Sequence, residues 1–158
     1  MAVDKAETKR RLRRFEQACR RHGLRMTHQR TEIFRVLAQT DEHPDAETVY
    51  RRVHRRIPAM SLDTVYRTLG LLEAQGLVRK AESLSGPARY DANAERHHHF
   101  VCTVCGLMKD VYSKALDDLP IPRCVGLFGH VETAQVQLRG ICALCANRKH
   151  TNRRRSPV

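Results

Sequence analysis

The chain of 158 residues is long enough for two small domains, and its 29 Lys and Arg against 17 Asp and Glu give a formal net charge of +12. Such an excess of positive charge favours a polyanionic partner, of which nucleic acid is the first candidate. No apolar run approaches the roughly 18 residues of a membrane span, and the charged N-terminus is unlike a signal peptide, so we expect a cytoplasmic protein without membrane contact. In that compartment the six cysteines favour metal ligation over disulfides.

The first half of the chain has the periodicity of helices. Helices are expected at residues 5–22, 28–39, 46–55 and from 62 onward. Thr27, Asp45 and Ser61 precede the last three of these segments, where their side chains can accept backbone N–H groups as N-caps.

The last of these helices is patterned like a DNA recognition helix. Its apolar positions form one stripe, made of Leu62, Val65, Leu69 and Leu72. The opposite face presents Thr64, Tyr66 and Arg67. Arg67 can pair with a guanine edge or a phosphate, and Tyr66 with a phosphate or a thymine methyl group. A solvated helix face is the plainer interpretation, but the net charge of the chain favours DNA contact.

A β-hairpin is predicted after this helix. Strands are expected at residues 77–81 and 88–91, with a turn at residues 85–87. A hairpin in this position makes a winged helix, in which Arg79, Lys80 and Arg89 bring positive charge near the DNA backbone. We therefore predict a winged-helix DNA-binding domain over residues 1–90.

Four cysteines form two C-x-x-C pairs. Cys102 and Cys105 make the first pair, and Cys142 and Cys145 make the second. Each pair can direct both sulfurs to one ion, so the two pairs together suit a closed tetrahedral Zn²⁺ site that joins two distant segments. Redox-active or merely buried cysteines are the alternative, although neither role needs two matching pairs.

Histidines gather just before the first cysteine pair. In an extended strand, alternate side chains share a face, so His97 and His99 point one way and His98 points the other. Asp91 lies shortly before them and can supply oxygen to the same ion. His43, which Pro44 restrains to non-helical dihedral angles at a helix start, is a further plausible ligand.

The second half of the chain predicts a small sheet. Short strands are expected at residues 100–102, 107–112 and 131–140, and residues 117–125 fit either a helix or a loop. Such a sheet can pair with a second copy of the chain. We therefore predict an α+β chain, with an α/β dimerisation and metal-binding domain over residues 91–147 and a basic disordered tail over residues 148–158.

Five motifs in this order give the chain a family resemblance. They are HPDAETVY at 43–50, SLDTVYRTLGLLEAQGLV at 61–78, RYD at 89–91, HHHFVCTVCG at 97–106 and GICALC at 140–145. Over roughly Leu24 to Cys145 the chain resembles the ferric uptake regulator family of metal-sensing repressors. The resemblance implies a winged-helix domain, a dimerisation domain, and a homodimer that binds a palindromic operator when its sensory metal is bound.

The resemblance also implies two metal sites. The structural zinc falls on the four paired cysteines, in agreement with their spacing. The sensory site falls on His43, Asp91, His97, His99 and Asp110. A set of imidazole nitrogens and carboxylate oxygens suits Fe²⁺ or Mn²⁺, and Zn²⁺ can also bind it.

Two aspartates bear on the stimulus. Iron-sensing members commonly have glutamates where this chain has Asp91 and Asp110, which makes it similar to the peroxide-responsive branch. In that branch iron-dependent oxidation of a ligand histidine, here His43 or His97, releases the metal and the DNA. An iron- or zinc-responsive repressor of metal uptake genes is the alternative.

The remaining expectations concern His98 and catalysis. The further metal site of many iron sensors is incomplete at Arg96, His98, Thr133 and Ala134, so His98 is expected to be a strand-face residue and not a ligand. We expect no enzyme. A metal-dependent nuclease or hydrolase is the alternative from another class, but it needs an open coordination position and a nearby general base.

Overall fold

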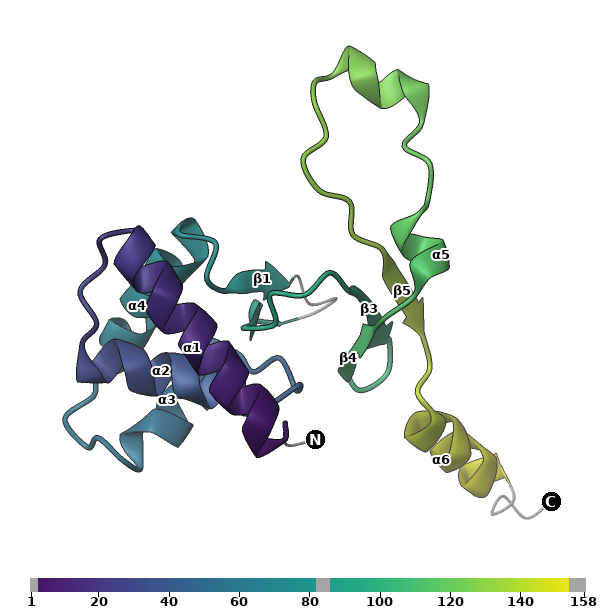
Figure 1. Ribbon diagram of the computed structural model, residues 1–158. Helices are drawn as coiled ribbons and strands as arrows, with labels where there is room; N and C mark the ends of the chain where they lie inside the picture. The colour runs from purple at the N-terminus through teal and green to yellow at the C-terminus, as the bar shows by residue number, and fades with distance from the viewer. Residues whose placement is uncertain (1–2, 82–85, 154–158) are drawn as a thin grey trace. The chain divides into compact units, whose positions relative to one another are not determined.

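The computed structural model describes residues 3–81 and 86–153 (Figure 1). The chain divides into two compact units, with the boundary between Ala94 and Glu95. Within the described residues, no helix is both long and apolar enough to cross a membrane.

Four helices build the first unit, as the periodicity predicts. They are α1 (Lys5–Arg21), α2 (His28–Ala38), α3 (Ala46–His54) and α4 (Leu62–Ala74). A side-chain oxygen caps each N-terminus by accepting a backbone N–H, and the four capping residues are Asp4, Thr27, Asp45 and Ser61. The helices bury one apolar core, in which the rings of Phe15 and Phe34 stack with centroids 4.1 Å apart.

A hairpin follows α4 and completes the expected winged helix. Strands β1 (Arg79–Ala81) and β2 (Arg89–Asp91) pair antiparallel, so that Arg79 lies opposite Asp91. The outward side chains of Arg79 and Lys80 are exposed, whereas Ala81 and Tyr90 are buried. Of the predicted turn at residues 85–87, residue 85 lies outside the described residues.

The second unit contains a three-stranded sheet. The strands β3 (His98–Cys102), β4 (Met108–Val111) and β5 (Gln137–Gly140) are ordered β4-β3-β5. β3 and β4 form an antiparallel pair, whereas β3 and β5 run parallel, so the chain makes a long connection before β5 returns (Figure 1). That connection contains α5 (Lys114–Asp117) and the 3-10 helix η1 (Arg123–Leu127), and α6 (Ala143–Arg153) follows β5.

Two expectations for this unit need correction. The strand predicted at residues 131–140 exists only at 137–140, because β3 begins at His98 and offers residues 131–135 no strand to pair with. The tail predicted to be disordered from residue 148 is helical as far as Arg153, since no Gly or Pro interrupts α6. Residues 154–158 lie outside the described residues.

Candidate metal centres and nucleic-acid interface

Backbone pairing brings the two cysteine pairs together. In the parallel ladder between β3 and β5, Cys102 lies opposite Gly140, which places Cys142 two residues beyond the end of the ladder. Thr103 N donates to the Gly140 carbonyl oxygen at 2.7 Å and extends this contact. A Cβ on Gly140 would come within 3.1 Å of the Phe100 ring, so glycine permits the close approach of the two segments.

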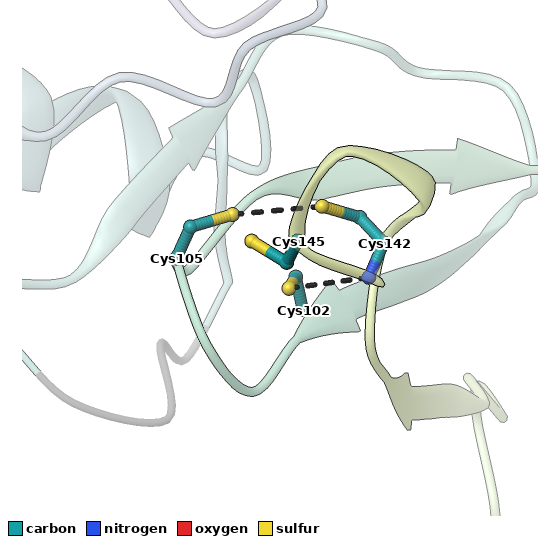
Figure 2. A group of neighbouring side chains, drawn as sticks. All are labelled: Cys102, Cys105, Cys142 and Cys145. Atoms are coloured by element: carbon teal, nitrogen blue, oxygen red, sulfur yellow. Dashed lines mark hydrogen bonds between the residues drawn. The ribbon is translucent and has the colours of Figure 1, made fainter. Parts of the chain in front are cut away.

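The four sulfur atoms form a tight cluster (Figure 2). All lie within 4.8 Å of one another, and Cys105 Sγ is 3.8 Å from Cys142 Sγ. The Cys142 N–H donates to Cys102 Sγ at 3.3 Å. Cys102, Cys142 and Cys145 are buried, whereas Cys105 is exposed. The structure therefore places the predicted set in one group, and four thiols at this spacing fit the donor set of a structural Zn²⁺.

Hydrogen bonds around the cluster shift the pKa values of two of its thiols in opposite directions. Backbone N–H groups of Cys142 and Cys105 donate to Cys102 and lower its pKa to about 6. Hydrogen bonding to the thiols of Cys105 and Cys142 raises the pKa of Cys145 to about 12. The pKa of Cys102 is thus lowered and that of Cys145 raised, and a cation among the sulfurs would favour the thiolate form of both.

A second donor set in the same unit consists of His97, His99 and Asp110. The ladder pairs His99 with Asp110, and His97 points to the same face of β3. The Nε2 atoms of the two histidines are 3.1 Å apart, and each lies 3.9 Å from Asp110 Oδ1. Three ligands predicted from the sequence therefore converge within this unit.

The other imidazole nitrogens of this set face protein groups. His97 Nδ1 lies 2.8 Å from the Glu95 carbonyl oxygen, and His99 Nδ1 lies 3.2 Å from the side-chain amide of Gln135. Such partners fix the orientation of each ring and leave both Nε2 atoms directed toward Asp110. Neither Glu95 nor Gln135 is recognisable from the sequence, since their role depends on where the chain passes in space.

The first unit holds the remaining predicted ligands, His43 and Asp91. Both are buried, and His43 Nε2 lies 3.9 Å from Asp91 Oδ2. Tyr90 N donates to the Pro44 carbonyl oxygen at 3.0 Å, which joins the loop before α3 to strand β2. Asn93 N donates to Asp91 Oδ1 at 2.7 Å and fixes that carboxylate.

His98 takes part in a different contact. Its Nε2 lies 3.2 Å from Asp117 Oδ1, and its Nδ1 accepts the N–H of Val136 at 3.1 Å. Arg96 also contacts Asp117, at 3.1 Å. His98 therefore points away from His97 and His99, as the strand alternation predicts, and it serves to fasten α5 to the sheet.

The candidate DNA-binding residues lie on exposed parts of the first unit. Tyr66 and Arg67 on α4 are 47% and 78% exposed, and Arg67 pairs weakly with Asp63 one turn away, at 3.3 Å. Thr64 has a local partner as well, because its N–H and hydroxyl both bond to the Ser61 hydroxyl, at 3.1 and 2.8 Å. Its side chain thus contributes to the N-terminal cap of α4.

A winged helix joined to a small α/β unit with clustered thiols, imidazoles and carboxylates defines a class of metal-binding transcription regulators. Comparison with known proteins agrees: the model of the ferric uptake regulator family matches residues 21–127. The chain belongs to this family, whose members are metal-dependent transcriptional regulators.

Relatives come from two branches of the family. The chain is 35% identical over 106 residues to the ferric uptake regulation protein of Brucella abortus biovar 1 (strain 9-941), covering 66% of this chain and 75% of that protein. It is 29% identical over 127 residues to the peroxide-responsive repressor PerR of Staphylococcus epidermidis, covering 80% and 84%. The solved structure of a Campylobacter jejuni peroxide stress regulator superposes with a TM-score of 0.67 at 31% identity, covering 82% and 97%.

Proposed function

We propose that the chain is a metal-dependent DNA-binding repressor that acts as a homodimer on a palindromic operator. The observation that carries the proposal is the division of the donor groups. His43 and Asp91 belong to the unit that contains α4, whereas His97, His99 and Asp110 belong to the unit that contains the cysteine cluster. The five side chains can share one ion in only some arrangements of the two units, so metal binding favours those arrangements.

Two kinds of ion suit the two donor sets. The four thiolates would hold Zn²⁺ and join β3 to the start of α6 permanently. The imidazoles and carboxylates would hold Fe²⁺ or Mn²⁺. These ions would exchange, because they bind a given set of nitrogen and oxygen donors more weakly than the later first-row divalent metals do. On the DNA side, Tyr66 and Arg67 would contact the major groove with Thr64 at the helix start, and Arg79 and Lys80 would contact phosphates.

The proposed stimulus is hydrogen peroxide. Asp91 and Asp110 are the carboxylates of the sensory set, as is typical of the peroxide-responsive branch that the chain resembles. Bound Fe²⁺ supplies reactivity toward peroxide, and the imidazole of His43 or His97 is the expected target. An imidazole that has gained oxygen is a poorer ligand, so the two units lose the arrangement that fits DNA.

Mass spectrometry tests this stimulus directly. The Fe²⁺ and Mn²⁺ forms of the protein are treated with peroxide in parallel, digested and mapped. We expect one added oxygen atom on His43, His97 or His99 in the Fe²⁺ form alone, together with loss of operator binding in a gel shift. If peroxide releases the DNA while all three histidines remain unmodified, the mechanism is excluded.

An iron- or zinc-responsive repressor of metal uptake genes is the second candidate. The 35% identity to the Brucella ferric uptake regulation protein favours it. This version predicts that operator binding follows the free concentration of Fe²⁺ or Zn²⁺ and is indifferent to peroxide in the Mn²⁺ and Fe²⁺ forms alike. A metal-dependent nuclease, the minor alternative, would cleave the DNA in the same gel shift.

A further inference from the structure

The backbone at His43 has an unusual conformation. Among the described residues, His43 is the one non-glycine residue with a positive φ, at 49°. L-residues visit this left-handed region rarely, because the Cβ crowds the backbone there. Pro44 follows and further limits the dihedral angles of His43. A ligand in this conformation keeps it only if neighbouring groups hold it.

Strand β2 of the wing supplies those groups. Arg89 Nη1 donates to the His43 carbonyl oxygen at 3.2 Å and makes a longer contact, 3.5 Å, with the carbonyl oxygen of Glu42. Asp45 and Arg89 form an isolated antiparallel bridge, and Tyr90 N donates to the Pro44 carbonyl oxygen. Arg89 is therefore partly committed to the loop that carries His43 and is not simply a free charge on the wing.

The same short strand carries the second ligand of this unit. Asp91 lies two residues after Arg89 and opposite Arg79 of β1 in the hairpin. Its Oδ1 is held by Asn93 N, and its Oδ2 faces His43 Nε2 at 3.9 Å. One ligand thus belongs to the wing, and the backbone of the other ligand is braced by the wing.

We propose that Arg89 is a positioning residue for His43, through which metal uptake is coupled to the wing that carries Arg79 and Lys80. The proposal rests on the proposed function, because it assumes that His43 and Asp91 bind the sensory ion. When they do, the ion adds a further link between the loop before α3 and strand β2, and this holds strands β1 and β2 more firmly in place. Metal then has a route to the DNA-contacting charges inside the first unit alone, in addition to any change between units.

A phosphate contact is the competing role for Arg89, and charge-conserving substitution separates the two. Lys in place of Arg89 keeps the positive charge but lacks the guanidinium geometry that reaches the His43 carbonyl oxygen. If Arg89 served only as a phosphate contact, neither Arg89→Lys nor Arg89→Met would change the affinity for Mn²⁺. Arg55→Met is the matched control, because it removes an exposed positive charge from the same unit at a residue outside the wing.

The experiment measures Mn²⁺ binding by calorimetry on the full-length, zinc-loaded protein. We expect Arg89→Met to weaken Mn²⁺ binding by about tenfold, as is usual for partners that orient a metal ligand. Arg89→Lys should weaken it less, and Arg55→Met should leave it unchanged. If Arg89→Met fails to fold, as judged by circular dichroism and zinc content, Arg89→Lys carries the same comparison. Wild-type affinity in a folded Arg89 variant would overturn the proposal.

Hydrogen exchange supplies a readout of the wing itself. In the wild type, Mn²⁺ should slow hydrogen exchange of the amides of β1 and β2. In Arg89→Met this protection should be smaller, even at a Mn²⁺ concentration that saturates the variant. Unchanged exchange in wild-type β1 and β2 while Mn²⁺ binds would refute the coupling and leave the proposed function intact. Failure of the wild type to bind Mn²⁺ would overturn both.

Discussion

The cysteine cluster and the histidine–carboxylate groups are assembled by different means. Cys102 and Cys142 come together because parallel strands β3 and β5 are hydrogen-bonded up to Gly140, within one unit. The five ligands proposed for the sensory ion are instead divided between two units, and His43 is held by side-chain and backbone contacts to a neighbouring loop and strand. The first arrangement is preformed by the sheet, whereas the second, as proposed, would depend on the ion.

This difference separates a structural role from a responsive one. A site whose ligands are already fixed gains stability from its metal but has no second arrangement to select. A site whose ligands belong to separate parts can report the ion, because binding free energy is then differential between arrangements. Substitutions at the two sites should therefore have qualitatively different effects.

The largest effect is expected for Cys142→Ser. Binding of zinc contributes about 10–16 kcal/mol to the folding of small structural zinc domains, and a serine in place of one thiolate weakens that binding. We expect the second unit to lose its fold and the chain to lose zinc and dimerisation, as followed by zinc content, circular dichroism and sedimentation. The exposed Cys124, which is outside the cluster, provides the control Cys124→Ser, which should retain all three.

A folded, dimeric and zinc-free Cys142→Ser protein would contradict the structural role of the cysteine cluster. It would mean that the pairing of β3 with β5 and the core of the second unit suffice without the metal. The cluster would then have to be treated as a second responsive site.

The next effect in size is expected for Asp110→Ala. Removal of a ligand should weaken Mn²⁺ binding by more than about 100-fold, since even the outer partners of a ligand contribute 10–100-fold. The fold and the zinc should be retained, because Asp110 is no part of the cysteine cluster, and operator binding should become independent of Mn²⁺. Calorimetry and gel shifts measure the two consequences, and Asp118→Ala, which changes an exposed aspartate nearby, is the matched control.

A variant that loses its fold would instead place Asp110 among the structural groups. Retained Mn²⁺ affinity in folded Asp110→Ala would remove it from the sensory set. Either result would show that Asp110 does not distinguish a responsive site from the structural cysteine cluster.

Local signals account for what the sequence could predict. Capping side chains such as Thr27 and Ser61 stand next to the helices they begin, and the apolar stripe of α4 repeats within a single helix. The cysteine pairs carry their own spacing, so the cluster could be predicted without knowledge of the sheet. Strand alternation likewise separates His98 from His97 and His99, and the contact between His98 and Asp117 bears this out.

Long-range partners account for what the sequence could not predict. The alternating pattern of residues 131–135 is as strand-like as that of 137–140, but only the latter pair with β3. Gln135 reaches His99, and Arg89 reaches the His43 carbonyl oxygen, through chain paths that no spacing rule describes. Arg11 reads as one more surface charge in a basic helix, yet it is buried against Glu7 and Asp41.

The smallest effect is expected for Glu7→Gln, which tests how the segment leading to His43 is supported. Burial raises the pKa of Glu7, but hydrogen bonds from the guanidinium groups of Arg10 and Arg11 outweigh it and hold that pKa below 4.5. Arg11 in turn contacts Asp41, two residues before His43, at 3.2 Å. Loss of the Glu7 charge should lower the free energy of unfolding by about 1 kcal/mol at neutral pH.

The pH dependence of that loss follows from the depressed pKa of Glu7. A carboxylate whose pKa is lower in the folded state stabilises the fold fully above its unfolded value and ceases to do so as pH falls through the folded value. The difference between wild type and Glu7→Gln in urea unfolding should therefore shrink as pH drops below 4.5. Glu16→Gln, which breaks the exposed pair with Arg20, is the control and should be nearly neutral throughout. If the difference in the free energy of unfolding persists in acid, Glu7 acts through packing. The charge of Glu7 would then contribute little to the stability of the loop that carries His43.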